Sequence, residues 1–221
     1  MKKMNNTKNI IIVVAITAGI AWLVFNSISS KNSTGPQTNS GNSSQVSGQS
    51  VDSHHAAASP IDETAFKNLV GRKAPDFTLS SSNNGDISIS SLKGKKVVPF
   101  FNEGLMCYPA CWNQIVELSK DKRLARGDIA VLNIVVDSSA DWKNAISQMP
   151  DLAKSTVLFD TTKSVSQNYG VLALPSSMHR GTMPGHSYVV IDKTGIVRFV
   201  FDDSAMGLQN DMMISELSKI N

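Results

Sequence analysis

Residues 100–118 read FFNEGLMCYPACWNQIVEL, and this stretch decides the fold because it joins a buried strand to a helix through a loop that holds both cysteines of the chain. The aromatic pair ends an apolar run, and large apolar residues then recur at helical spacing from Trp112 to Leu118. Proline needs no backbone N–H at the start of a helix, so we expect Pro109 at the first helical position. The sequence therefore predicts a strand, a loop and a helix, with the cysteines at the junction.

Apolar runs and helical patterns alternate on both sides of this unit. We expect strands at 97–101, 129–136, 156–159, 187–191 and 196–201, and helices around 112–118, 142–149 and 212–220. Residues 192–195, DKTG, supply a hairpin turn with glycine where positive φ is favoured. Continuous apolar strands between helices indicate a mainly parallel sheet, which the closing hairpin makes mixed. The expected fold class is α/β, with a mixed central sheet flanked by helices on both faces.

Pro99, in the run VVPFF, does not fit a regular strand because proline has no N–H to donate to a neighbouring strand. Such a residue belongs at a strand start, an edge or a bulge. We therefore expect a local irregularity just before the cysteines.

The amino-terminal part of the chain differs in composition from the rest. Residues 10–25, IIIVVAITAGIAWLVF, form an unbroken apolar stretch behind three lysines, and Ser, Asn and Gly dominate after it. We expect a basic cytoplasmic tail at 1–8, a transmembrane signal-anchor at 9–26, a disordered linker at 27–62 and a globular domain at 63–221. A cleaved signal peptide is the alternative, but no A-x-A site follows the apolar stretch. The prediction is a single-pass membrane protein with an extracytoplasmic domain.

The overall composition excludes one class of partner. Hydrophobic residues make up 41% of the chain and charged residues 18%, which is ordinary for a globular protein. The net charge is only +3, and several lysines lie at the extreme amino terminus. We therefore expect no nucleic-acid partner.

The two cysteines are candidates for chemistry rather than for stabilisation alone. Cys111 is expected in the first helical turn, where free N–H groups and the helix dipole stabilise a thiolate. Cys107 lies close enough to attack a substrate itself or to resolve an intermediate formed at Cys111. A structural disulfide is the alternative outside the cell. However, a disulfide that closes a loop of about five residues stabilises a fold by only ~2 kcal/mol, whereas one that closes a loop of about 100 residues contributes ~4.7 kcal/mol. Cysteines four apart in an unbroken helix also point poorly at each other, so we expect bond formation to require rearrangement and the exposed bond to be labile.

Four stretches carry a resemblance to a known family. They are GRKAPDFTL from Gly71, LKGKKVV from Leu92, the cysteine loop, and SYVVIDKTG from Ser187. Together they resemble the alkyl hydroperoxide reductase and thiol-specific antioxidant branch, the peroxiredoxins or redoxins, of the thioredoxin superfamily over about residues 63–221. The resemblance implies a thioredoxin-like fold without a cofactor, and it puts Cys111 at the peroxidatic position.

The chain departs from the family pattern at two positions. Tyr108 stands where the family has a threonine or serine, and His186 stands where it has a substrate-positioning arginine. Tyrosine keeps a hydroxyl on a longer arm, and histidine keeps a donor whose charge depends on pH. We expect Tyr108, His186 and Pro109 to position the substrate.

The function that the resemblance implies is that of an antioxidant thiol oxidoreductase acting on peroxides or protein disulfides. Cys111 would attack the substrate, Cys107 would resolve the product, and an external thiol donor would reduce the pair. Trp112 and Tyr108 would wall the site. We expect Glu103 to be solvated rather than to relay protons.

A second hypothesis is a metal site. The C-x-x-x-C spacing and a distant histidine near the hairpin resemble the ligand set of copper chaperones of the Sco type, so Cys107, Cys111 and His186 would bind copper. Met178, His179 and Met183 lie in the preceding loop, and we expect them to serve packing. A third hypothesis, a docking domain without catalysis, is disfavoured by the cysteine pair.

Overall fold

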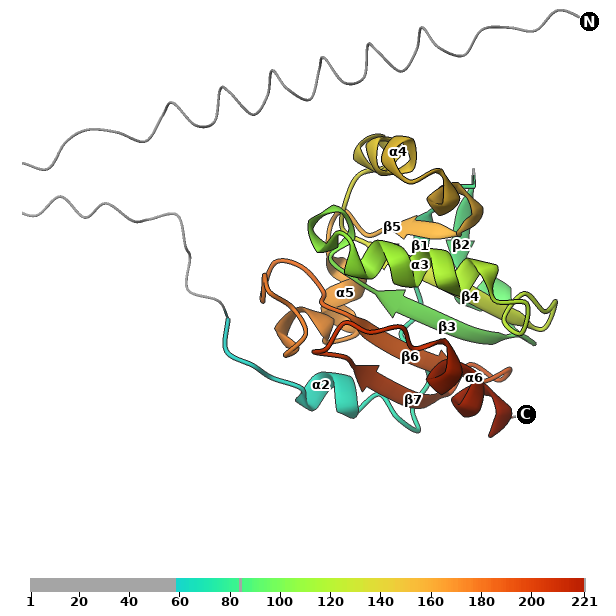
Figure 1. Ribbon diagram of the computed structural model, residues 1–221. Helices are drawn as coiled ribbons and strands as arrows, with labels where there is room; N and C mark the ends of the chain where they lie inside the picture. Colours follow the sequence, from blue (N-terminus) through green and yellow to red (C-terminus); the bar gives the residue numbers. More distant parts are fainter. Residues whose placement is uncertain (1–58, 84, 221) are drawn as a thin grey trace, which may run out of the picture. The chain divides into compact units, whose positions relative to one another are not determined.

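The computed structural model describes residues 59–83 and 85–220 (Figure 1). Its strands are β1 (Thr78–Ser80), β2 (Asp86–Ser88), β3 (Lys96–Phe101), β4 (Ile129–Val135), β5 (Val157–Phe159), β6 (Ser187–Ile191) and β7 (Val197–Asp202). Its α-helices are α2 (Thr64–Lys67), α3 (Ala110–Lys120), α4 (Ser139–Gln148), α5 (Ser164–Asn168) and α6 (Asn210–Ser218). The 3₁₀ helices are η1 (Ser90–Leu92), η2 (Gly104–Cys107), η3 (Pro150–Lys154) and η4 (Val171–Ala173).

The main sheet has the order β5-β4-β3-β6-β7, and β1 and β2 form a separate two-stranded sheet. β3 is parallel to β4 and antiparallel to β6, while β6 and β7 form the closing antiparallel hairpin. Gly195 in that hairpin has φ of 88°, a conformation that glycine adopts without strain. The predicted mixed sheet is therefore confirmed, with β3 at its centre.

Both faces of the sheet are covered. Side chains that alternate along β3 enter two separate cores, so that Val98 and Phe100 meet α3, α4 and α6 on one face. Val97 and Phe101 lie on the other face, in a core that includes residues of α2 and α5. Figure 1 shows α3 running across the sheet close to β3 and β4. Within α3, Ile115, Val116 and Leu118 are buried, which is the periodicity that predicted the helix.

Pro99 lies in the central strand, so the expectation of an edge or a strand start is wrong. On the β4 side it is aligned with Leu132. On the β6 side the antiparallel pairs join Val97 to Ile191 and Phe100 to Tyr188, and positions 98 and 99 fall between these pairs. The register is the same on both sides of these positions, so the irregularity is an interruption of the pairing, not a bulge, at a place where proline has no N–H to donate.

The expected tail, the membrane anchor and most of the linker, residues 1–58, lie outside the described residues. In the part of the chain that is described, no helix has both the length and the apolar character needed to cross a bilayer. Residues before 63 nevertheless contact the domain. Arg180 Nε donates to the carbonyl of Ser59 at 3.2 Å, and Asp62 N donates to the carbonyl of Ala173 at 3.0 Å.

Candidate active site

The two cysteines form a disulfide at the carboxyl end of β3, with their Cα atoms 5.3 Å apart. Cys107 ends η2 and Cys111 is the second residue of α3, while Tyr108 between them is extended. The cysteines therefore do not share one unbroken helix, contrary to our assumption, and the rearrangement expected on bond formation stays a prediction. Pro109 immediately precedes α3, one position earlier than we expected.

The turn that carries Cys107 is fixed from three sides. Gly104 N donates to Asn102 Oδ1 at 3.0 Å, Leu105 N donates to Asp137 Oδ2 at 3.1 Å, and Trp112 Nε1 donates to the Gly104 carbonyl at 3.0 Å. Gly104 has φ of 55°, and a Cβ there would lie 1.7 Å from Asp137 Oδ2. Burial raises the pKa of this aspartate. Only glycine fits the turn, which is why the loop contains one.

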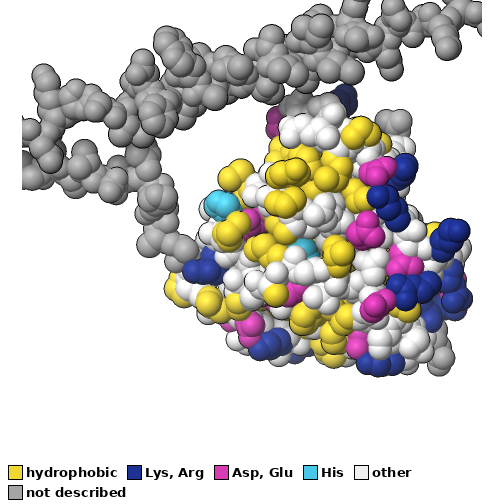
Figure 2. Space-filling model, viewed as in Figure 1, with side chains coloured by type: hydrophobic (Ala, Val, Ile, Leu, Met, Phe, Trp, Pro, Cys, Tyr) yellow, Lys and Arg dark blue, Asp and Glu magenta, His cyan; other side chains and the backbone are white. Residues whose placement is uncertain are grey.

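The disulfide is buried, contrary to the expectation of an exposed bond. Cys111 is 0% exposed and Cys107 is 4% exposed, whereas Tyr108 is 63% exposed. The Tyr108 ring packs edge-on against Trp112, with 5.0 Å between the ring centroids. Figure 2 shows hydrophobic side chains gathered around the amino-terminal end of α3, where this loop lies. Tyr108 thus forms part of the outer wall, and its role in positioning substrate stays a prediction.

His186, immediately before β6, lies beside the cysteine pair as the sequence analysis expected. Its Nδ1 is 3.6 Å from Cys111 Sγ and its Nε2 is 2.9 Å from Tyr188 Oη, and the ring also packs edge-on against Phe100. Burial lowers the pKa of His186 to about 4, although Asp203 and the backbone of Gly207 act in the opposite direction. The imidazole is therefore neutral near pH 7 while the disulfide is formed, with one nitrogen as donor and one as acceptor.

The sulfurs and the imidazole could also hold a metal ion. One ligand atom each from Cys107, Cys111 and His186 lies within 4.8 Å of the others, and all three residues are buried. Two thiolates and an imidazole form a soft donor set that suits copper, once the disulfide has been reduced. Met206 Sδ lies 4.0 Å from Cys107 Sγ. Met206 could not be predicted from the sequence, because it lies in a loop without a motif, far from the cysteines along the chain.

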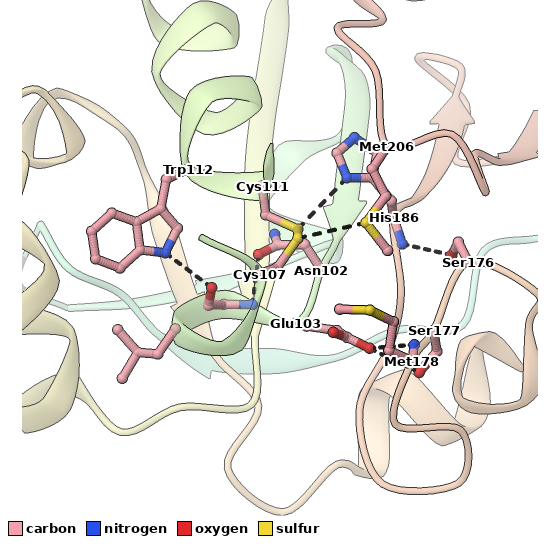
Figure 3. The surroundings of a disulfide bond; sticks show 12 residues. Asn102, Glu103, Cys107, Cys111, Trp112, Ser176, Ser177, Met178, His186 and Met206 are labelled. Carbon is pink, nitrogen blue, oxygen red and sulfur yellow. Dashed lines mark hydrogen bonds between the residues drawn. A yellow bond between two sulfur atoms is a disulfide. The ribbon is translucent and has the colours of Figure 1, made fainter. Parts of the chain in front are cut away.

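Glu103 is buried, so the expectation that it is solvated is wrong. Its side chain is 0% exposed, and Oε1 accepts hydrogen bonds from Met178 N at 2.7 Å, His179 N at 3.1 Å and Ser177 Oγ at 3.1 Å. Figure 3 shows the carboxylate pointing to the turn at Ser177 and Met178, below the disulfide. The loop that the sequence analysis assigned to packing is thus hydrogen-bonded to the residue that precedes the Cys107 turn.

A serine and an aspartate, which the sequence analysis also missed, hold the backbone of His186. His186 N donates to Ser176 Oγ at 2.6 Å, and Ser176 Oγ in turn donates to Asp202 Oδ1 at 2.5 Å. Ser187 Oγ donates to the same carboxylate oxygen at 2.8 Å. These partners come from separate segments, and no sequence motif joins them.

Comparison with known proteins identifies relatives. Peroxiredoxin Q of Sedum lineare is 31% identical over 156 residues, which cover 68% of this chain and 76% of that protein. Peroxiredoxin Q of Oryza sativa subsp. japonica is 28% identical over 156 residues, which cover 68% of this chain and 65% of that protein. The chain thus spans slightly less than two thirds of the length of the rice relative.

Solved structures support the same fold. The mitochondrial 2-Cys peroxiredoxin of Plasmodium falciparum superposes with a TM-score of 0.57 at 26% identity, covering 68% of this chain and 92% of that one. AhpC of Enterococcus faecalis gives a TM-score of 0.60 at 16% identity, covering 68% and 91%, and shows the fold alone. The thioredoxin-like fold expected from the sequence is confirmed. The AhpC/TSA family model matches residues 70–200, more than half of the 221 residues, and the chain therefore belongs to the AhpC/TSA family.

Proposed function

We propose that this protein is a thiol oxidoreductase of the peroxiredoxin type, which reduces peroxides or disulfides through Cys107 and Cys111. One observation carries the proposal: the two sulfurs are bonded at the amino end of α3, with the His186 imidazole 3.6 Å from Cys111 Sγ. The names of the relatives, among them peroxiredoxin Q, support it.

The reaction starts from the reduced pair. The Cys111 thiolate attacks one oxygen of a hydroperoxide, so that an S–O bond forms and the O–O bond breaks, and the departing oxygen takes up a proton and leaves as water or an alcohol. The Cys107 thiol then attacks the sulfenic acid at Cys111, which forms the disulfide and releases water. An external dithiol returns two electrons and two protons by thiol–disulfide exchange and is itself oxidised to a disulfide.

Two features favour Cys111 as the attacking sulfur. It is the second residue of α3, where unpaired N–H groups and the helix dipole stabilise negative charge. Its neighbour His186 is neutral beside the disulfide, but a thiolate at Cys111 favours the protonated imidazole. A disulfide substrate would follow the same course, with a mixed disulfide at Cys111 in place of the sulfenic acid.

The residues around the sulfurs bear on the choice between peroxide and disulfide. In place of a permanently charged arginine, the site has a buried histidine, and Tyr108 is largely exposed. A peroxide oxygen would therefore receive hydrogen bonds from His186 and from the amino end of α3 rather than from a fixed cation. We expect peroxide reduction to be slow relative to disulfide exchange.

The location of this chemistry is also part of the proposal. Residues 9–26 would anchor the chain in the membrane by a single span, with the domain on the extracytoplasmic side. The thiol donor would then have to act on that side. Protease digestion of intact cells or spheroplasts tests the orientation, because a domain that stays protected contradicts it.

Alkylation of the full-length chain tests the reactive cysteine. In Cys107→Ser, which keeps only Cys111, the rate of reaction with iodoacetamide against pH should give an apparent pKa below the ordinary ~8.5 of cysteine. Cys111→Ser provides the matched control for Cys107. A pKa of Cys111 at or above about 8.5 contradicts the activated thiolate. Peroxide and a small disulfide, each added to the reduced wild type, should remove two thiols per molecule and rank the two substrates.

Copper binding is the second candidate, because three ligand atoms lie within 4.8 Å and Met206 Sδ lies close to Cys107 Sγ. The reduced full-length chain is incubated with Cu(I) and desalted. Stoichiometric copper that His186→Ala fails to retain, together with negligible peroxide turnover, would favour this candidate. Failure of the reduced chain to retain copper, or retention that His186→Ala leaves unchanged, would exclude it.

A further inference from the structure

Glu103 is a buried charge that the proposed mechanism does not use. It lies between the end of β3 and η2, and no part of it reaches solvent. Burying a carboxylate is costly unless it is hydrogen-bonded. The three donors to Oε1 all come from one turn, Ser177 to His179, some 75 residues further along the chain. Glu103 therefore links two segments that are distant in sequence: the loop before His186 and the turn that ends at Cys107.

The first segment carries His186. Ser176, next to the turn, accepts the hydrogen bond from His186 N. The single hydroxyl proton of Ser177 is shared between Glu103 Oε1 and the Met183 carbonyl, which lies 2.9 Å from Ser177 Oγ. The backbones are packed in direct contact, since a Cβ at Gly185 would lie 2.4 Å from Ser177 N. A displacement of the turn at 177–179 is thus transmitted to the backbone of His186.

The second segment carries Cys107. The carbonyl of Glu103 accepts a hydrogen bond from Met106 N at 3.1 Å. This hydrogen bond lies at the start of η2, the 3₁₀ turn that ends at Cys107. The backbone of Glu103 thus belongs to the cysteine turn, while its side chain belongs to the His186 loop. Figure 3 shows both segments converging on the disulfide.

We propose that Glu103 is a positioning residue that couples the cysteine turn to the loop holding His186, so that the redox state of the disulfide is felt at residues 177–179. The proposal deepens the oxidoreductase function and rests on it. The carboxylate acts by accepting hydrogen bonds at Oε1 and not by carrying a proton.

A proton relay is the competing role. Glu103 Oε2 lies 3.3 Å from His179 Nδ1, and within the described residues neither atom has a hydrogen-bond partner. His179 is partly exposed, so the pair could connect buried Glu103 to solvent. Glutamine separates the two roles, because its amide oxygen accepts the same hydrogen bonds but its side chain cannot transfer a proton at neutral pH.

The test compares Glu103→Ala and Glu103→Gln with wild type in the full-length chain. Glu216→Ala, on α6 where the carboxylate pairs with Lys219, is the matched control for loss of a carboxylate. The first readout is the backbone amide NMR shift of Met178 and His179 between the oxidised and reduced states. We expect a clear shift in wild type, in Glu103→Gln and in the control, and a shift at least twofold smaller in Glu103→Ala.

The second readout is the equilibrium constant of the cysteine pair with glutathione. Glu103→Ala should change it by about fivefold or more, whereas Glu103→Gln should stay within about twofold, since a lost buried hydrogen bond is worth roughly 1 kcal/mol. Ser177→Ala, which removes one donor and leaves the carboxylate in place, should show a smaller change in the same direction. It serves as the reference if Glu103→Ala does not fold.

The coupling would be overturned if the redox-dependent amide shifts were absent in wild type, or if they were as large in Glu103→Ala as in wild type. It would also be overturned if Glu103→Gln and Glu103→Ala reduced these shifts equally, which would indicate proton transfer. None of these measurements requires turnover of a peroxide. Failure of the oxidoreductase proposal would instead appear as an ordinary pKa for Cys111, whatever residue occupies position 103.

Discussion

Replacing His186 with glutamine should remove a distinct part of the acid sensitivity of the fold. Burial depresses the pKa of this imidazole from 6.5 to about 4, so between these pH values the unfolded chain binds a proton that the folded chain does not. The free energy of unfolding therefore falls as the pH drops through this window, and it is unaffected above it. At about 1.4 kcal/mol per pH unit, the full window is worth roughly 3 kcal/mol.

Among the described residues, carboxyl groups with a lowered pKa act at lower pH than this window. Burial alone would raise the pKa of Asp192, but hydrogen bonds from Thr194 and Ile196 and the Arg198 guanidinium lower it to about 2, so the contribution of this group to stability is lost only at lower pH. The pKa of Asp137 is raised by burial, so this group gains a proton in the folded state and acts in the opposite sense. Asp192 and Asp137 are present in both wild type and His186→Gln, so their effects on the free energy of unfolding cancel when the two pH profiles are compared.

Urea denaturation of the oxidised full-length chain measures the effect, with fluorescence of the buried Trp112 and Trp142 as the signal. Between about pH 7 and about pH 4.5, wild type should lose roughly 2 to 3 kcal/mol more than His186→Gln. The glutamine amide can still reach toward Tyr188, which limits the cost of the substitution itself. Parallel pH profiles for the two proteins would refute the assignment of a buried, neutral imidazole.

The same denaturation assay checks two pairs of substitutions, each with a matched control. Gly104→Ala should cost more than about 2 kcal/mol, because its Cβ would meet Asp137 Oδ2 and its φ is positive, whereas Gly127→Ala, with open space around it, should change stability by less than about 0.5 kcal/mol. Leu152→Ala should lower the free energy of unfolding by roughly 2 to 5 kcal/mol, because it leaves a cavity in the core, whereas Leu208→Ala, at an exposed position, should be close to neutral. Equal effects of the two substitutions within either pair would contradict the packing described.

The main sheet could be predicted from the sequence because its central strands are buried on both faces and are therefore continuous apolar runs. The helices α3, α4 and α6 were predictable because each is long enough to show its apolar periodicity. By contrast, β1, β2, α2 and α5 have three to five residues each, which is too short for a period to be visible. Their positions are set by contacts with the sheet and not by local pattern.

The site could be predicted as far as the topology carries the information. β6 runs antiparallel to β3 with Phe101 opposite Ser187, so the residue before β6 must lie beside the residues that follow β3. That pairing brings His186 to the cysteines. Glu103 could not be placed in this way, because two of its partners are backbone amides, which almost every residue carries, and the third is the hydroxyl of a loop serine. An acidic residue between Asn102 and Gly104 therefore resembles an ordinary solvated loop residue until the fold is known.

Burial of both sulfurs makes reduction of the disulfide a gated reaction. Cys107, with 4% exposure against none for Cys111, is the sulfur that a thiol in solution meets first, and we expect the exchange to require an opening of the turn that carries Cys107. The rate should rise linearly with reductant at low concentration and level off at the opening rate of the turn. Above that concentration the chemical strength of the reductant ceases to matter, and the loop alone sets how long the oxidised state lasts.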